Sequence, residues 1–302
     1  MEFGRLPSVD QVDFTLPPDA QATTDRLAGL DPSQRTAIYL GTPMWADPAY
    51  VGTLYPRGTK SGQFLARYGE QLNTVELNTT YYRVDRGDVA RWADAVPDGF
   101  RFCPKVHQII SHQMRLRGAE VATERFLKAM SDFGAKLGPI WMLLPPEFGP
   151  RDFPVLEAWV RRFGSAAAWA IELRHPDWFR DPRALSAAMS LFDETGVSTV
   201  LTDVAGRRDV LHQTLTTDTA FLRFVGNGLH PTDHPRVDDW IERLSSWTAR
   251  GLRTLYLFLH QPDERSNVEM VHYVAPRLAE ATGCTVVTPK RVAAQRSLFG
   301  DR

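Results

Sequence analysis

The sequence predicts an α/β protein built as a single (β/α)8 barrel of the TIM type, with an N-terminal extension and a flexible C-terminal tail. Short β-branched or aromatic runs alternate with longer amphipathic runs along most of the 302 residues, as in repeated strand-helix units. The length and the 43% hydrophobic content suit one barrel. No glycine-rich GxGxxG or GxxxxGK(S/T) loop follows a strand, so we expect no nucleotide cofactor.

Composition divides the chain into three parts. A polar, proline-containing extension covers residues 1–34, the barrel covers 35–288, and a polar tail covers 289–302. Eight runs in the barrel have strand length and are bounded by glycine, proline or polar residues. The predicted strands are Ala37 to Thr42, Thr74 to Thr80, Phe100 to Val106, Pro139 to Pro145, Ala168 to His175, Ser198 to Asp203, Thr219 to Gly226 and Thr254 to Gln261.

Helices are predicted in most gaps between these strands, because apolar residues recur there with spacings of three and four. They are Gly62 to Leu72, Asp88 to Ala95, Thr123 to Leu137, Phe153 to Phe163, Pro182 to Gly196, Val237 to Arg250 and Val268 to Ala281. The link AGRRDVLHQTLTT between the sixth and seventh strands is short and polar, and we expect an irregular loop there. Crossover links of these lengths favour a closed barrel over an open sheet.

Charge and cysteine content exclude some classes of protein. With 35 basic and 36 acidic residues the net charge is −1, whereas a dedicated nucleic-acid binder carries a basic excess, so any such contact needs a local patch. Cys103 and Cys284 form no CxxC pair and are expected to be free thiols. The chain shows neither a secretory signal nor an apolar run of about 18 residues, so we expect a cytoplasmic protein without membrane contact.

Polar residues interrupt the apolar strands near their carboxyl ends. Strand alternation puts Glu76 and Asn78 on one face of the second strand, opposite Val75 and Leu77. We expect the polar face to point into the barrel mouth, where TIM barrels carry their catalytic residues. Other strands contribute Lys105, Glu172, Arg174, Asp203, Arg223 and His260.

Two interpretations of this cluster remain open. One is a buried network, Glu76 with Lys105 and Glu172 with Arg174 or Arg223, that only neutralises charge. The other is an active site. Two carboxylates with separated pKa values would suit acid-base chemistry on a carbohydrate, whereas the lysine and the two arginines would hold a phosphate or carboxylate. The catalytic candidates are Glu76, Lys105, Glu172 and Asp203.

Further residues at the strand ends are candidates for substrate binding. Tyr81, Tyr82 and Trp178 follow strands and would stack on a base or sugar. A divalent metal is an option because histidines accompany the carboxylates, but no HxH or HExxH pair occurs and no ligand is assigned. The substrate-binding candidates are Asn78, Tyr81, Tyr82, His112, Arg174, His175, Trp178, Arg223 and His260.

Four ordered blocks carry a family resemblance. They are TVELNTTYYR from Thr74, FRFCPKVHQIISH from Phe100, LLPPEF from Leu143 and AIELRHPDWF from Ala170. With them the chain resembles the YecE-like family (domain of unknown function 72) over about residues 37–283. The resemblance implies a barrel of the general shape of sugar isomerases and apurinic-site endonucleases, without a settled reaction. The chain departs from the family pattern at Leu144, Val225-Gly226 and His260-Gln261.

The C-terminal tail, TPKRVAAQRSLFGDR, presents Gln295, Leu298 and Phe299 near its end. This pattern resembles the short peptide by which bacterial proteins dock on the DNA sliding clamp, a glutamine followed by a leucine-phenylalanine pair that fills an apolar pocket. We expect these three residues to bind such a partner from a disordered tail, because the segment has no core of its own.

The rim cations and the tail together favour a hydrolase-like enzyme that acts on a phosphorylated or nucleic-acid substrate in DNA maintenance. A carboxylate-pair enzyme acting on a carbohydrate is one alternative. A binding barrel without chemistry is the other, and it follows if the rim charges only neutralise one another.

Overall fold

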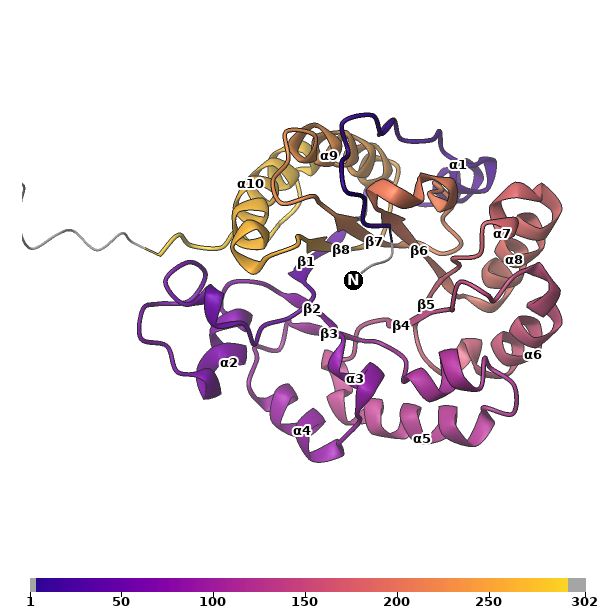
Figure 1. The fold of residues 1–302 in the computed structure, drawn as a ribbon, viewed down its shortest axis with the longest axis horizontal. Coiled ribbons are helices and arrows are strands. Elements are labelled where there is room, and N and C mark those ends of the chain that lie inside the picture. Colours follow the sequence, from indigo (N-terminus) through magenta and orange to yellow (C-terminus); the bar gives the residue numbers. More distant parts are fainter. Residues whose placement is uncertain (1–3, 293–302) are drawn as a thin grey trace, which may run out of the picture.

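A computed structural model describes residues 4–292 and contains one parallel eight-stranded sheet that curves into a barrel (Figure 1). The strand order is β3-β2-β1-β8-β7-β6-β5-β4, so each strand lies beside its neighbour in sequence and β1 pairs with β8. The strands are β1 (Ala37–Thr42), β2 (Thr74–Leu77), β3 (Arg101–Pro104), β4 (Ile140–Leu143), β5 (Trp169–Glu172), β6 (Ser198–Asp203), β7 (Thr219–Val225) and β8 (Thr254–His260).

The barrel closes between β3 and β4 through a short seam. Val106 N donates to Trp141 O at 2.9 Å, and Gly138 N donates to Phe102 O at 2.7 Å. Isolated bridges replace a continuous ladder here, joining Lys105 to Trp141 and Phe102 to Leu137. The predicted fold class, a single TIM-type barrel, is confirmed.

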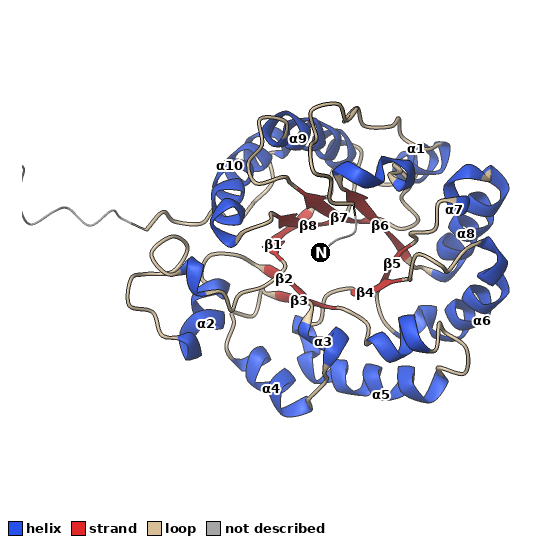
Figure 2. Ribbon diagram, viewed as in Figure 1, coloured by secondary structure: helices blue, strands red, loops and turns tan. Residues whose placement is uncertain are grey.

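Helices surround the barrel (Figure 2). The α-helices are α1 (Gln21–Ala28), α2 (Phe64–Gly69), α3 (Thr79–Tyr82), α4 (Arg86–Asp94), α5 (Glu120–Met130), α6 (Phe153–Phe163), α7 (Asp177–Arg180), α8 (Pro182–Thr195), α9 (Asp233–Ala249) and α10 (Glu264–Thr282). Shorter helical turns are η1 (Pro48–Tyr50), η2 (Ser61–Gln63), η3 (Ile109–Gln113), η4 (Ser131–Lys136), η5 (Pro150–Asp152), η6 (Gly164–Ala166) and η7 (Ala205–Val210). Within residues 4–292, no helix has the length and apolar character needed to cross a membrane.

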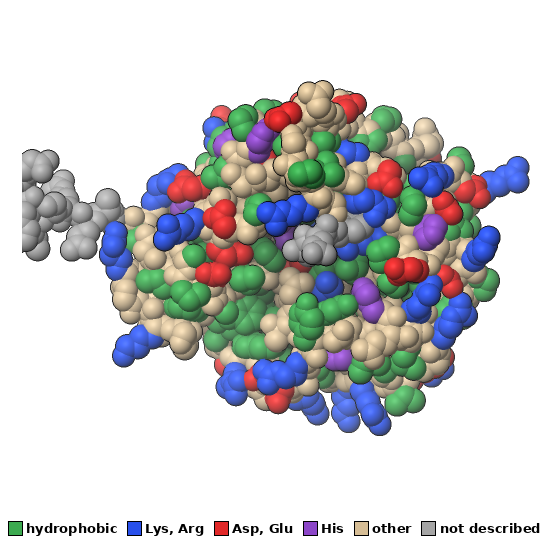
Figure 3. Space-filling view, in the orientation of Figure 1, with side chains coloured by type: hydrophobic (Ala, Val, Ile, Leu, Met, Phe, Trp, Pro, Cys, Tyr) green, Lys and Arg blue, Asp and Glu red, His purple; other side chains and the backbone are tan. Residues whose placement is uncertain are grey.

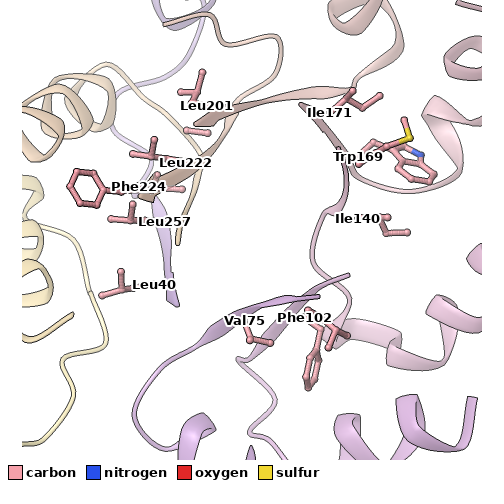
Figure 4. Close-up of a cluster of buried hydrophobic side chains, with 14 of the residues drawn as sticks. Leu40, Val75, Phe102, Ile140, Trp169, Ile171, Leu201, Leu222, Phe224 and Leu257 are labelled. Carbon is pink, nitrogen blue, oxygen red and sulfur yellow. The ribbon is translucent and has the colours of Figure 1, made fainter. Parts of the chain in front are cut away.

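Strand alternation builds two apolar layers. Outward-facing side chains such as Leu40, Phe102 and Leu222 pack between the strands and the helices (Figure 4). Inward-facing side chains form a separate, smaller cluster that fills the barrel interior below the mouth. That inner cluster comprises Cys103, Trp141, Leu143, Ala170, Val200, Phe221, Tyr256 and Phe258.

Local chemistry explains where the long helices begin and end. The Asp263 carboxylate accepts a hydrogen bond from Ser266 N and caps α10. At α8, Asp181 accepts from Arg183 N, and Pro182 occupies the first helical position. Gly196 ends the same helix with a φ of 70°, a left-handed conformation that favours glycine.

The structure differs from the predicted elements mainly at the carboxyl ends of strands. β2 ends at Leu77 rather than Thr80, because the following residues turn into α3. β5 ends at Glu172 rather than His175. The predicted irregular loop after β6 contains the helical turn η7, and the extension contains α1.

The extension packs along the outside of the barrel. Gly206 N in η7 donates to Gly4 O at 2.8 Å. Further along, Asp19 binds Arg243 at 2.6 Å and accepts from the indole of Trp247 in α9 at 3.1 Å. These contacts attach the extension to η7 and α9 rather than leaving it separate.

Candidate functional site at the barrel mouth

Arg223 in β7 joins two carboxylates that come from two other strands, β2 and β5. Its Nε donates to Glu76 Oε2 at 2.8 Å, and one terminal nitrogen donates to Glu76 Oε1 at 3.2 Å. The other terminal nitrogen donates to Glu172 Oε2 at 3.1 Å. All three side chains are buried inside the barrel, so this bidentate geometry offsets the cost of their desolvation.

Three further side chains form polar contacts with the two carboxylates. Arg174 Nε donates to Glu172 Oε1 at 2.7 Å. His260 Nε2 lies 3.0 Å from Glu76 Oε2, and Asn78 Nδ2 donates to Glu76 Oε1 at 3.1 Å. Every carboxylate oxygen of the pair therefore has at least one hydrogen-bond partner.

These partners hold both glutamates in the ionised form. Burial alone raises the pKa of Glu76, but Arg223 and His260 outweigh it, so the pKa lies well below the ordinary value. Burial likewise raises the pKa of Glu172, and Arg174 together with Arg223 lowers it below the ordinary value. The two pKa values move in the same direction, whereas an acid-base pair needs them to separate.

Lys105 reaches the mouth because the β3 strand ends beside it. Pro104 has no backbone N–H, and Lys105 N donates to Leu77 O of β2 at 3.0 Å. Thr80 Oγ1 in α3 donates to Lys105 O at 2.7 Å and lies 3.0 Å from Leu77 O. This hydroxyl fixes α3 over the end of β3 and brings Tyr81 against the lysine.

The Lys105 ammonium lies between two aromatic rings. Its Nζ is 4.5 Å from the centroid of Tyr81 and 4.7 Å from that of Trp141. The side chain is 8% exposed, and no residue among those described forms a hydrogen bond or ion pair with Nζ. Burial, followed by repulsion from Arg223, lowers its pKa to about 8, although Glu76 and Glu172 act in the opposite direction.

Two further polar groups in this interior lack a hydrogen-bond partner among residues 4–292. One is the indole N–H of Trp141, and the other is the hydroxyl of Thr202. Thr202 pairs in register with Arg223, so both side chains point to the inner face of the sheet. Lys105, Trp141 and Thr202 thus present hydrogen-bond donors that have no partner in the described part of the chain.

Aromatic and histidine side chains line the rim above Lys105. Tyr81 makes edge contacts with His112 and Tyr82, at centroid distances of 5.2 and 4.9 Å. Burial, with Lys105 and Arg174 nearby, lowers the pKa of His112 to about 4, so it is neutral at physiological pH. Tyr82 is 69% exposed. In the orientation of Figure 1, Figure 3 shows charged and histidine side chains around the centre, beside a hydrophobic area.

Asp203 and Trp178 lie away from the mouth. Asp203 follows the inward-facing Thr202, so alternation turns it outward, where it accepts from Arg236 and from the indole of Trp240 in α9, at 2.8 and 2.7 Å. The Trp178 ring is fully buried and donates to Phe148 O at 2.8 Å. Neither side chain is therefore placed for the catalytic or stacking role that the sequence suggested.

The remaining sequence candidates lie at the edge of the site or beyond the described residues. His175 Nδ1 accepts from Asp177 N at 3.1 Å in the turn after β5. The tail residues Gln295, Leu298 and Phe299 lie outside residues 4–292.

Metal ligands do not cluster in the described part of the chain. Among residues 4–292, no group of three or more His, Cys, Asp or Glu side chains is arranged to hold a metal ion. The histidines near the mouth have other partners, because His260 contacts Glu76 and His112 Nδ1 lies 2.8 Å from Ser111 Oγ.

A groove of about 810 Å³ lies elsewhere, between the extension near Phe14 and helix α9. Two arginines in its lining are already engaged, Arg236 with Asp203 and Arg243 with Asp19. The charged side chains that line this groove therefore stabilise the packing of the extension on the barrel. We place the candidate chemistry in the mouth, where unmatched donors meet a buried cation.

Trp141 and Thr202 are the site residues that the sequence did not reveal. Trp141 lies within the apolar run IWML and looked like core, and Thr202 is a common strand residue. The register between strands identifies them, because Lys105 forms an isolated backbone bridge with Trp141 and Thr202 pairs with Arg223. Register between distant strands is a property of the folded barrel.

Comparisons with known proteins agree with this architecture. A family model described as "Protein of unknown function DUF72" matches residues 39–295. UPF0759 protein YecE of Escherichia coli (strain K12) is 32% identical over 254 residues, which cover 78% of this chain and 90% of that protein.

Solved structures of two DUF72 family proteins share the fold. The protein from Enterococcus faecalis has a TM-score of 0.61 at 20% identity, covering 83% of this chain and 100% of that chain. The one from Thermotoga maritima has a TM-score of 0.58 at 20% identity, covering 77% and 97%. The chain therefore belongs to the DUF72 family of proteins of unknown function.

Proposed function

We propose that this barrel is an enzyme that binds a phosphorylated substrate in its mouth and brings the reacting centre against Lys105. The observation that carries the proposal is a set of three groups, Lys105 Nζ, Trp141 Nε1 and Thr202 Oγ1, which can all donate hydrogen bonds and have no acceptor among the described residues. Their natural complement is a ligand rich in acceptor oxygens. Phosphate esters have this character.

The charge of the mouth supports the same substrate class. Lys105, Arg174 and Arg223 face two carboxylates, Glu76 and Glu172, so these five side chains carry one more positive than negative charge when all are ionised. A purely structural network would balance its charges, because an uncompensated buried charge is costly. A single anionic group on a ligand would restore the balance.

The exposed rim adds room for the rest of a substrate. Tyr82, Met44 and Ile109 are exposed large hydrophobic side chains that follow β2, β1 and β3 in sequence. An aromatic ring such as Tyr82 suits stacking on a nucleobase or a sugar face. A small phosphorylated molecule and a nucleic-acid strand both satisfy these features.

The geometry of the mouth supports a class of substrate, but it does not single out one reaction. Phosphoester hydrolysis, the reaction suggested by the sequence, needs a group that activates water, and both buried glutamates are engaged by arginines. The carbohydrate alternative has less support, because neither glutamate keeps the raised pKa that a general acid requires. The link to DNA maintenance depends on the tail motif.

Inorganic phosphate and a thymidine dinucleotide phosphodiester are suitable probes. We expect phosphate to raise the melting temperature of the wild-type protein, by about 3 °C if it is present at tenfold its dissociation constant. The Lys105→Met variant should show no such shift from its own baseline, whereas Lys60→Met, which alters an exposed lysine, should respond like wild type.

The comparison of variants decides the proposal. Equal shifts in all three proteins would mean that phosphate binds elsewhere, and the proposal would be wrong. A response to the dinucleotide at lower concentration than to phosphate would favour a nucleic-acid substrate.

A further inference from the structure

We propose that Lys105 is a nucleophilic amine that forms an imine with the carbonyl carbon of a phosphorylated aldehyde or ketone in the barrel mouth. This inference rests on the proposed function and names both its substrate class and its chemistry. Three groups surround the amine, Tyr81, Trp141 and Arg223, which come from α3, β4 and β7.

The two aromatic rings leave the Lys105 amine able to lose its proton and react. Most buried lysines pair with a carboxylate, which would hold the ammonium form. Lys105 instead lies over the rings of Tyr81 and Trp141, at 4.5 and 4.7 Å, without an ion pair to any described residue. An aromatic face stabilises a cation without accepting its proton, so the lysine can deprotonate and react.

The surroundings of Lys105 also set its protonation. Positive groups face it from β7, with Arg223, and from the end of β5, with Arg174. Negative groups face it from β2, with Glu76, and β5, with Glu172, while Tyr81 and the neutral His112 lie on the rim. Burial and Arg223 dominate, and the pKa of about 8 leaves a substantial neutral fraction near pH 7.5.

The proposed step balances without a further reactant. The neutral amine attacks the carbonyl carbon, an N–C bond forms, and the proton moves from nitrogen to the carbonyl oxygen to give a carbinolamine. The proton that the ammonium released to solvent on becoming the neutral amine returns to this hydroxyl, the C–O bond breaks, water leaves and the nitrogen lone pair forms the C=N bond, so that the sum is ammonium plus carbonyl giving iminium plus water. The iminium keeps the single positive charge of the ammonium, so Tyr81 and Trp141 contact a cation before and after the step.

Reductive trapping tests this chemistry on the intact wild-type protein. The probe is glycolaldehyde phosphate with sodium cyanoborohydride, which reduces an iminium to a stable secondary amine. The chain has five lysines, so peptide mapping by mass spectrometry compares Lys105 directly with Lys60, Lys128, Lys136 and Lys290. At pH 7.5 we expect Lys105 to be modified at least about tenfold faster, because its neutral fraction exceeds that of an ordinary lysine by roughly a hundredfold.

Two controls separate the possible outcomes. Unphosphorylated glycolaldehyde should label Lys105 more slowly, and inorganic phosphate should protect it. In urea-unfolded protein all five lysines should react alike. Labelling of Lys105 at the rate of the exposed lysines in the folded protein would overturn the imine proposal, even if phosphate binding is observed. Rapid labelling by both aldehydes without phosphate protection would keep the imine chemistry and overturn phosphate recognition.

Discussion

Replacing Lys105 with methionine should stabilise the protein at neutral pH. The structure lowers the pKa of Lys105 from 10.5 to about 8, which corresponds to about 3 kcal/mol of destabilisation while the lysine is charged. Methionine has a similar length and no charge, and it leaves two arginines facing two glutamates. Loss of the cation-π contacts with Tyr81 and Trp141 offsets about 1 kcal/mol, so the net gain is about 2 kcal/mol.

The stability gained in Lys105→Met should depend on pH in a characteristic way. A lysine whose pKa is lower in the folded than in the unfolded state destabilises the fold fully below the folded value, here about 8. The destabilisation disappears as the pH rises towards 10.5, because the proton is then lost in both states. The stability difference between Lys105→Met and wild type should therefore shrink between pH 8 and 10.5.

Thermal and urea unfolding across this pH range measure the effect, which should be about 4 °C in melting temperature at pH 7. Lys136→Met is the matched control. The Lys136 amine donates to Ala93 O and Val96 O, at 2.8 and 2.7 Å, so its removal should destabilise the fold by about 1–2 kcal/mol. If Lys105→Met is less stable than wild type, or if its advantage does not change with pH, Lys105 is a compensated structural cation and not a reactive amine.

Four other predictions concern separate features. Arg223→Met should cost about 3–5 kcal/mol in urea unfolding, because it leaves Glu76 and Glu172 buried without their shared cation; a loss below 1 kcal/mol would contradict the network. Glu76→Gln should weaken the fall in stability below about pH 4.5. A carboxylate with a lowered pKa stabilises the fold above its ordinary pKa, and this stabilisation is lost as the pH falls through the folded-state pKa. Acid unfolding identical to that of the wild type would refute this prediction. Trp178→Ala should destabilise by about 3–5 kcal/mol while Tyr82→Ala changes stability by less than about 0.5 kcal/mol, and equal effects in calorimetry would contradict the assigned burial. Leu298→Ala with Phe299→Ala should abolish micromolar binding to a bacterial sliding clamp, roughly −8 kcal/mol in surface plasmon resonance, without a change in melting temperature; early unfolding of the variant would mean that these residues are structural.

The sequence predicted the barrel well because its strands carry a strong local signal. β1 and β6 match their predicted ranges, since β-branched and aromatic runs there are bounded by polar residues. The carboxyl ends of β2 and β5 were extended too far. Thr79–Tyr82 and Asp177–Arg180 form short helices that depend on tertiary contacts, such as the Thr80 hydroxyl bound to Lys105 O.

The candidate site was only partly predictable, because alternation within one strand is local and register between strands is not. Alternation placed Glu76 and Glu172 inward, where Arg223 joins them. The strand-end position of Asp203 suggests a catalytic role, but its side chain points outward to Arg236 in α9. The sequence also gave no indication that one arginine would satisfy both glutamates and leave Lys105 among aromatic rings.

The short β3–β4 seam ties ligand binding to the integrity of the barrel. Lys105 comes from the β3 side of the seam and Trp141 from the β4 side, and the hydrogen bond from Val106 N to Trp141 O lies between them. A molecule that contacts both side chains therefore links the two sides of the seam, where isolated bridges replace a continuous ladder of hydrogen bonds. Opening of the seam and release of the molecule become one coupled equilibrium, so tighter binding also means a barrel that opens less often.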